Sequence, residues 1–237
     1  FKSTIMHYMQ LSAMAKFEGA CASTYDTEVN ITEDRLKTLV SSVDGLENED
    51  IIDNGRWIIT DKTKYHGNEW FEKIKDYMDE KIKNAKSITS EIPFLDRDGK
   101  TLLTMLTPTF TEIDSLTKFE TESSYSMQED NELGDSGANT LYMKEGQAKK
   151  RLLSYLPKPA SLSNNYFLIS AHVGKDIPVD PRAAPVKKLQ FLKNNDVLKG
   201  VTADFTFLTT NCWQCQNAIP LMNDSTKGPE YHRDTTD

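Results

Sequence analysis

The chain has 237 residues, of which 38% are hydrophobic and 27% are charged. This length is enough for one large α/β domain or two small ones, each with a buried core of ordinary size. The net charge of −8 excludes a uniformly basic protein that coats nucleic acid, because neutralising phosphates needs a positive surface. Any nucleic-acid site must therefore be local.

Membrane insertion and disulfide bonding are not indicated. No run approaches the roughly 18 to 20 apolar residues of a membrane-spanning helix, and no charged-then-apolar signal segment leads the chain. Cys21, Cys212 and Cys215 are too few for a secreted disulfide framework. The motif "CWQC" has too few ligands for a structural zinc, so we expect buried thiols flanking Trp213. These features predict a cytoplasmic protein, in the host cytoplasm if it is viral.

The first elements are predicted in the order helix, strand, helix. Hydroxyl residues followed by apolar residues at helical spacing in "STIMHYMQLSAMAKF" predict a helix over 3–17. The run "GACASTYD" is small and compatible with a strand. In "NITEDRL", Asn30 is predicted as the N-cap of the next helix, with Glu33 completing a capping box.

The middle of the chain is predicted to hold a surface helix, a hairpin and a polar strand. The segment "NEWFEKIKDYMDEKIKN" is amphipathic. Its predicted apolar face consists of Trp70, Ile74, Tyr77 and Met78. A turn at Asp98–Gly99 predicts a hairpin in "FLDRDGKTLL". The run "TPTFTE" before Asp114 is less apolar than a buried parallel strand usually is, and it contains Pro108.

The remaining segments complete an alternating pattern. Residues 120–138 contain six acids and no base, which predicts a long mobile loop, and a helix over 140–156 then runs to Pro157. We expect strands in "NYFLISAHVG" and "TADFTFLTT", with a proline-rich basic loop, "DIPVDPRAAPVKK", between them. Strands that alternate with helices predict an α/β fold with a mostly parallel central sheet flanked by helices.

Several polar residues fit parts of an ATPase. Lys2 and Ser3 at a helix start match the end of GxxxxGK[ST], in which backbone N–H groups hold phosphate and a hydroxyl binds magnesium. The alternative is an ordinary N-cap. Asp114 after a strand could hold the shell of Mg²⁺, and Glu28 could polarise water. His172 could contact a γ-phosphate, or it could be a structural histidine.

The motifs resemble those of a known family when they are taken in order. They are "FKS" at 1–3, "YDTE" at 25–28, "IDSL" at 113–116, "ELGDSGANTLYMKEGQAKKRLLSYL" at 132–156 and "ISAHVG" at 169–174. This series resembles the RecA-fold recombinases, most closely the T-even phage branch of that family. The resemblance covers 1 to about 210 and implies a RecA-like P-loop ATPase core. It also implies a single domain over 1–237 that begins inside the phosphate loop and is incomplete at both ends.

The resemblance implies the roles of individual residues. Mg²⁺ would be held by Ser3 and Asp114, and Glu28 would be the general base, with Lys2 and His172 completing the catalytic set. The implied contacts with ATP are at Phe1, Lys2, Ser3, Thr4, Asp114 and Ser115.

The implied partner is single-stranded DNA. The window 174–199 is net positive in an otherwise acidic chain. The expected DNA contacts in it are Lys175, Arg182, Lys187, Lys188 and Lys193. The resemblance implies self-association into a helical filament or ring and homologous strand exchange in recombination and repair. Three alternatives stay open: a RecA-fold helicase or DNA motor, a degenerate scaffold without ATPase activity, and a ligand-binding sensor domain.

Overall fold

The computed structural model describes residues 2–47, 49–130, 138–175, 192–201, 204–213 and 215. The first elements are α1 (Lys2–Lys16), β1 (Cys21–Asp26), α2 (Glu33–Ser41), β2 (Trp57–Asp61), α3 (Gly67–Lys83), β3 (Thr89–Leu95) and β4 (Leu102–Leu106). They are followed by β5 (Thr109–Asp114), the 3₁₀ turn η1 (Leu116–Lys118), α4 (Glu122–Asp130), α5 (Ala138–Tyr155) and α6 (Pro157–Ser163). The last are β6 (Asn165–Ile169), β7 (His172–Lys175), β8 (Asp196–Lys199) and α7 (Asp204–Leu208).

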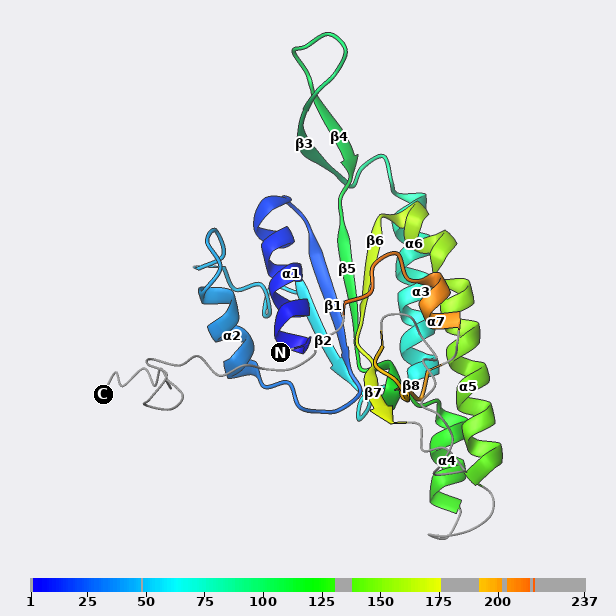
Figure 1. The fold of residues 1–237 in the computed structure, drawn as a ribbon. Helices are drawn as coiled ribbons and strands as arrows, with labels where there is room; N and C mark the ends of the chain where they lie inside the picture. The colour runs from blue at the N-terminus through cyan, green and yellow to red at the C-terminus, as the bar shows by residue number, and fades with distance from the viewer. Residues whose placement is uncertain are drawn as a thin grey trace, which may run out of the picture.

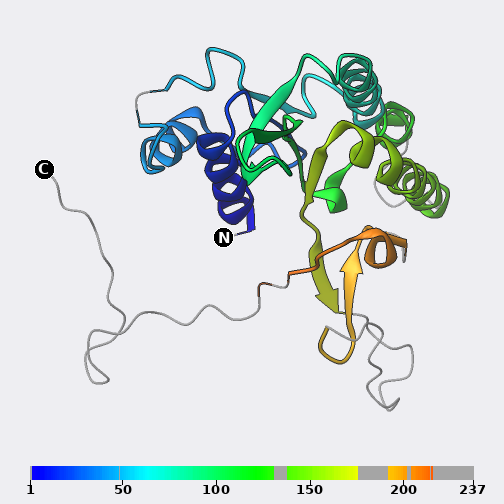
Figure 2. The same ribbon diagram turned by 90° about the horizontal axis from the view of Figure 1, so that it is seen from above.

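A four-stranded parallel sheet of order β2-β1-β5-β6 forms the centre of the fold. Helices α1 and α2 cover one face, and α3, α5 and α6 cover the other (Figures 1 and 2). This arrangement confirms the predicted α/β class and the parallel sheet. Because parallel strands point the same way, β1 and β5 end side by side, and Asp26 pairs with Asp114 in the register.

Alternation along the strands divides the core into two clusters. On β1, Ala22 faces α1 and α2, whereas Tyr25 faces α3. Tyr25 stacks on Trp70 of α3 with ring centroids 4.8 Å apart. The cluster on the α1 side includes Leu11, Met14, Ala20, Ala22, Leu36, Val40, Leu46, Ile51 and Trp57. Each face of the sheet therefore has its own apolar layer.

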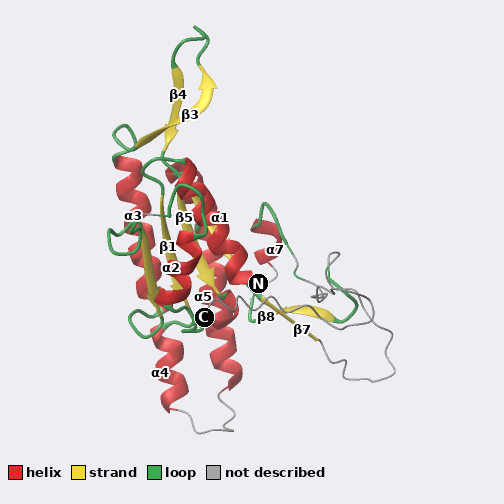
Figure 3. Cartoon of the chain, turned by 90° about the vertical axis from the view of Figure 1, so that its left-hand side faces the viewer, coloured by secondary structure: helices red, strands yellow, loops and turns green. Residues whose placement is uncertain are grey.

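Two small antiparallel sheets lie outside the central one. The hairpin β3–β4 confirms the prediction around Gly99 and extends from one end of the molecule (Figure 3). The helices α4 and α5 extend at the other end, and β7 pairs with β8 (Figure 3). None of the described helices is long and apolar enough to cross a membrane.

The helix beginning near Lys2, the strand β1 and the helices α3 and α5 agree with the sequence predictions. The capping prediction is wrong, because α2 begins at Glu33 with Thr32 as its N-cap. Asn30 instead donates its backbone N–H to the carboxylate of Asp26. Tyr77 is 38% exposed and does not belong to the buried face of α3.

Three predictions in the second half are also wrong. Residues 122–130 form α4, whose start is capped by mutual hydrogen bonds between Thr121 and Ser124. The predicted strand "NYFLISAHVG" is divided between β6 and β7, which belong to different sheets. The predicted last strand contains the short helix α7 in place of a strand, and Phe205 packs into the core cluster on the α3 side. Short apolar runs suit either element, and tertiary packing decides between them.

Other elements gave too weak a sequence signal to be predicted. Strand β2 has a mixed pattern and was not expected, and α6 begins at Pro157, which occupies the first helical position. Cys212 and Cys215 are exposed and Trp213 is 71% exposed, so the prediction of buried thiols is wrong. The proline-rich basic loop lies outside the described residues.

Helix α1 allows a direct test of the core on the α1 side. Leu11 is fully buried and Met9 on the same helix is 39% exposed. We expect Leu11→Ala to lower the free energy of unfolding by about 2–5 kcal/mol. The matched change Met9→Ala should lower it by about 0.5 kcal/mol or less. Urea unfolding followed by circular dichroism measures both, and equal effects would contradict the placement of α1.

Candidate functional site

The candidate site lies where β1 and β5 end. The residue pair Asp26 and Asp114 closes the ladder between these strands, and the N-terminal turn of α1 lies beside it. The carboxyl ends of parallel strands are the usual place for ligands in open α/β sheets. The structure therefore brings together Ser3, Glu28, Asp114, Ser115 and His172, which the sequence predicted as site residues.

Asp114 is the buried carboxylate at the centre of this site. Ser3 on α1 donates its hydroxyl to Oδ2 of Asp114. Ser170, just after β6, donates its hydroxyl to Oδ1 at 2.5 Å. Asp114 is only 3% exposed, so both carboxylate oxygens are bound by hydroxyl groups from different elements. Ser3 and Asp114, which the resemblance implies as magnesium ligands, are in contact although 111 residues separate them in the chain.

Glu28 is held at the rim of the site. Its Oε1 accepts a hydrogen bond from the Ser115 hydroxyl at 2.8 Å, and Nε2 of His172 lies 2.8 Å from the same oxygen. The Glu28 side chain is 26% exposed, so it is open to water while its orientation is fixed. His172 is the first residue of β7, whereas the sequence predicted one continuous strand through "NYFLISAHVG".

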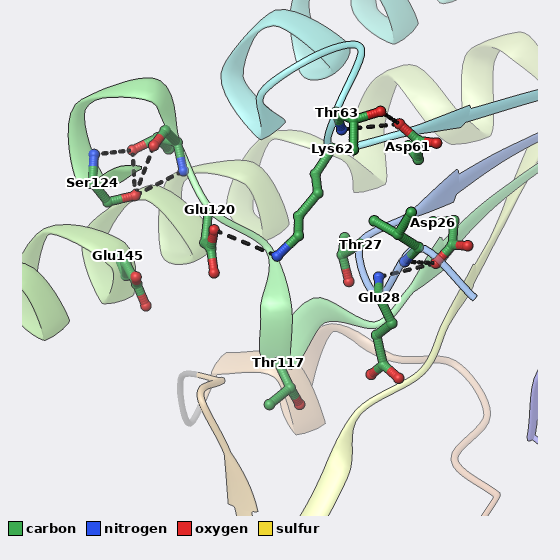
Figure 4. A network of polar contacts seen from close by, with 12 residues as sticks. Asp26, Thr27, Glu28, Asp61, Lys62, Thr63, Thr117, Glu120, Ser124 and Glu145 are labelled. Atoms are coloured by element: carbon green, nitrogen blue, oxygen red, sulfur yellow. Dashed lines mark hydrogen bonds and ion pairs between the residues drawn. The ribbon is translucent and has the colours of Figure 1, made fainter. Parts of the chain in front are cut away.

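Asp26 shapes the loop that carries Glu28. Its carboxylate accepts hydrogen bonds from four consecutive backbone N–H groups, at 2.7–2.9 Å, which belong to residues 28–31. The loop also contains Val29 with φ 54°, a conformation that is costly for a β-branched residue. Figure 4 shows Asp26 bound to the Glu28 backbone. Asp26 is not among the predicted site residues, although an acid at the end of a strand is a typical signal for such a loop.

Thr27 joins the ends of the two strands. Its hydroxyl donates to the carbonyl of Ser115 at 2.8 Å and accepts from the Ser115 N–H at 2.7 Å. Its own N–H donates to the carbonyl of Asp114 at 2.8 Å. Thr27 is 1% exposed, so these bonds are made away from water. They fix the Glu28 loop relative to the Asp114–Ser115 segment.

A second polar layer lies beneath Asp114. Glu112 precedes it by two residues and points to the same face of the sheet, toward α1. Its Oε2 accepts from the Gln10 side chain and from Thr24 Oγ1 at 3.1 Å, and His7 Nε2 lies 3.3 Å away. All four side chains are fully buried. These contacts explain why the strand before Asp114 is polar.

Thr117 connects the site to the strand pair β7–β8 and to α5. Its hydroxyl accepts the His172 N–H at 2.9 Å and donates to the carbonyl of Lys199 on β8 at 2.9 Å. Its carbonyl accepts from the amine of Lys149 at 3.1 Å. Lys149 is 1% exposed, and burial lowers the pKa of its amine. The position of the strand pair β7–β8 and the orientation of the Glu28 carboxylate are therefore linked through His172.

Other predicted residues are placed less favourably. Thr4 accepts a hydrogen bond from Arg35 Nη2 at 2.7 Å, so its hydroxyl is engaged with α2. Lys175 is ion-paired with Asp196, which partly neutralises it, whereas Lys193 is exposed. The remaining predicted residues, Phe1, Arg182, Lys187 and Lys188, lie outside the described residues.

The donor set suits magnesium bound together with a phosphate ligand. Within the described ranges, no group of three or more His, Cys, Asp or Glu side chains could hold a metal by itself. Magnesium keeps several waters and is commonly bound by one or two protein ligands plus substrate phosphates. The hydroxyl of Ser3 beside the carboxylate of Asp114 fits this requirement.

Comparisons with protein-family models, with curated protein sequences and with solved structures found no match. The functional assignment therefore depends on the contacts between α1 and the ends of β1 and β5.

Proposed function

We propose that the chain is a Mg-ATP-dependent, DNA-coupled ATPase with a RecA-like core. One observation carries this proposal: Ser3, which follows Lys2 in the first turn of α1, is hydrogen-bonded to Asp114 at the end of a parallel strand. A phosphate-binding helix start and a magnesium-binding aspartate must meet in this way in a P-loop ATPase. An ordinary N-cap does not require a buried carboxylate from another element.

The phosphates of ATP would bind at the start of α1. The backbone N–H groups of its first turn have no partners within the helix and point out of its end, where the helix dipole favours anions. Lys2 would add a positive charge to the terminal phosphates, and Ser3 and Asp114 would hold Mg²⁺. Bound Mg²⁺ would supply charge neutralisation for the phosphates.

Glu28 would act as the general base. Its carboxylate is partly exposed, and Ser115 and His172 fix one of its oxygens. A base that is already oriented loses less conformational freedom when it takes a proton from water. His172 would relay the nucleotide state to the strand pair β7–β8. Its backbone N–H donates to the Thr117 hydroxyl, and that hydroxyl donates to the carbonyl of Lys199 on β8.

Single-stranded DNA is the proposed partner of the region around β7 and β8, where Lys193 is exposed. We propose that the chain assembles on DNA as a filament and promotes homologous strand exchange in recombination and repair. A helicase or DNA motor would use the same ATPase contacts. An assay with homologous and non-homologous duplexes separates these functions, since only strand exchange requires homology.

The first prediction concerns turnover. We expect the full-length chain to hydrolyse Mg-ATP faster in the presence of single-stranded DNA. Glu28→Gln should lower kcat by about 10²–10⁴-fold and leave ATP affinity nearly unchanged, because it removes the base and not a phosphate contact. Lys2→Ala should weaken ATP binding, and Lys16→Ala at the exposed end of the same helix is the matched control.

Two outcomes of this assay would contradict the proposal. Absence of turnover with and without DNA would favour the scaffold alternative. Turnover that is unaffected by Glu28→Gln would remove Glu28 from the mechanism.

The second prediction concerns Thr27. Thr27→Val keeps the shape of the side chain but leaves the buried Ser115 N–H without its acceptor, at a cost of about 1–3 kcal/mol. We expect kcat to fall at least tenfold with little change in ATP affinity, since the Glu28 loop moves relative to Asp114. Thr27→Ser keeps the hydroxyl and should restore kcat. Equal activity of the two variants would show that the hydroxyl does not position the site.

A further inference from the structure

A second cluster of reactive side chains lies at the opposite end of the sheet. Cys21 and Thr109 are the first residues of β1 and β5 and pair with each other in the register. The last turns of α3 place Tyr77 and Lys81 beside them. Contacts connect the four side chains in one chain: Lys81 to Thr109, Thr109 to Tyr77 at 2.9 Å, and Tyr77 to Cys21 at 3.5 Å.

Lys81 is a buried amine without an acidic partner. Its residue is 3% exposed, and its amine donates to the neutral hydroxyl of Thr109. No ion pair with Lys81 is found among the residues that the structure describes. Because burial disfavours the charged form, the pKa of the Lys81 amine falls to about 8. About half of the amine is then neutral, and thus nucleophilic, near pH 8.

Cys21 and Tyr77 form the accessible side of this cluster. Cys21 is a free thiol that is partly exposed, and Tyr77 is 38% exposed. Burial of the ring raises the pKa of the Tyr77 phenol, which keeps the hydroxyl protonated as a hydrogen-bond donor. A reagent from solution therefore meets the thiol first and the amine second.

We propose that Cys21 and Lys81 form a covalent acylation site, at which the thiol accepts an acyl group from a small thioester and passes it to the amine. This acylation site is independent of the proposed ATPase, because the transfer uses none of the side chains that the ATPase proposal names.

The chemistry is balanced without a further reactant. The Cys21 thiolate adds to the carbonyl carbon of the thioester, and the bond to the leaving thiolate breaks; that thiolate takes up the proton given up by Cys21. The neutral amine of Lys81 then adds to the carbonyl carbon on Cys21. The carbon–sulfur bond breaks, an amide forms, and the proton lost from nitrogen returns to the Cys21 sulfur.

The product suits the environment of Lys81 better than the starting amine. A buried ammonium without a carboxylate partner is costly, whereas an amide is neutral and needs only hydrogen bonds. Acylation thus removes a charge that has no acidic partner among the described residues. This gives the transfer a direction toward nitrogen, in addition to the greater stability of an amide than a thioester.

The test uses acetyl-coenzyme A and the full-length chain carrying Cys212→Ser and Cys215→Ser, which removes the two exposed thiols. Peptide mass spectrometry measures acetylation at early times. We expect Lys81 to be acetylated several-fold faster than the exposed Lys86 nearby, with a rate that rises from pH 7 to pH 9. Cys21→Ala should lower the Lys81 rate about tenfold and leave Lys86 unchanged.

A second variant keeps the test decisive if Cys21→Ala does not fold. Lys81→Arg retains a charged, non-nucleophilic side chain, so S-acetyl Cys21 should accumulate in it and be removed by hydroxylamine. Equal acetylation of Lys81 and Lys86, or no S-acetyl Cys21 in Lys81→Arg, would overturn the proposal.

Discussion

The parallel pairing of β1 with β5 is the constraint on which the rest of the structure depends. Its register places Asp26 beside Asp114 at one end and Cys21 beside Thr109 at the other. A slip of one residue would turn every side chain of a strand to the opposite face, moving Asp114 away from α1 and Ile113 out of the core cluster on the α3 side. Thr27 opposes such a slip, because its hydroxyl makes two hydrogen bonds with the backbone of Ser115.

The polar face of α1 contacts the acidic side chains of β5 and so positions the candidate site. Ser3, His7 and Gln10 recur at helical spacing and meet Asp114 and Glu112, which alternate on one face of β5. Burying Glu112 and His7 costs free energy that an apolar pair would not cost. The hydrogen bond from Gln10 to Glu112 can form only at one position of α1 along β5, so it fixes the height of Ser3 relative to Asp114. The polar layer around Glu112 therefore sets the position of Ser3 relative to Asp114 in the site above it.

The elements and strand ends that depend on local sequence could be predicted. A helix over 3–17, the end of β1 and the alternation of strands and helices follow from spacing and composition, whereas the choice of Asp114 came from "IDSL", its place in the order of motifs and the family resemblance. Asp26, Thr27 and Glu112 were not assigned roles, because their importance comes from partners that are distant in sequence or from loop geometry. Helix α4 was missed because its acidic composition suggested solvation, whereas the hydroxyls of Thr121 and Ser124 cap its first turn.

The two ends of the sheet can serve different chemistry because the strands keep them apart. β1 is six residues long, so Cys21 and Asp26 are separated by about 17 Å at the usual rise of a strand. At about 17 Å, the Coulomb energy between two unit charges is about 1 kcal/mol at an effective dielectric constant near 20, so the loss of the charge at Lys81 has only a limited direct effect on Asp114 or Glu28. Coupling between the ends would need a shift of β1 against β5, which Thr27 and the core around Tyr25 oppose. Acylation of Lys81 should therefore change the stability of the fold more than it changes turnover at the other end.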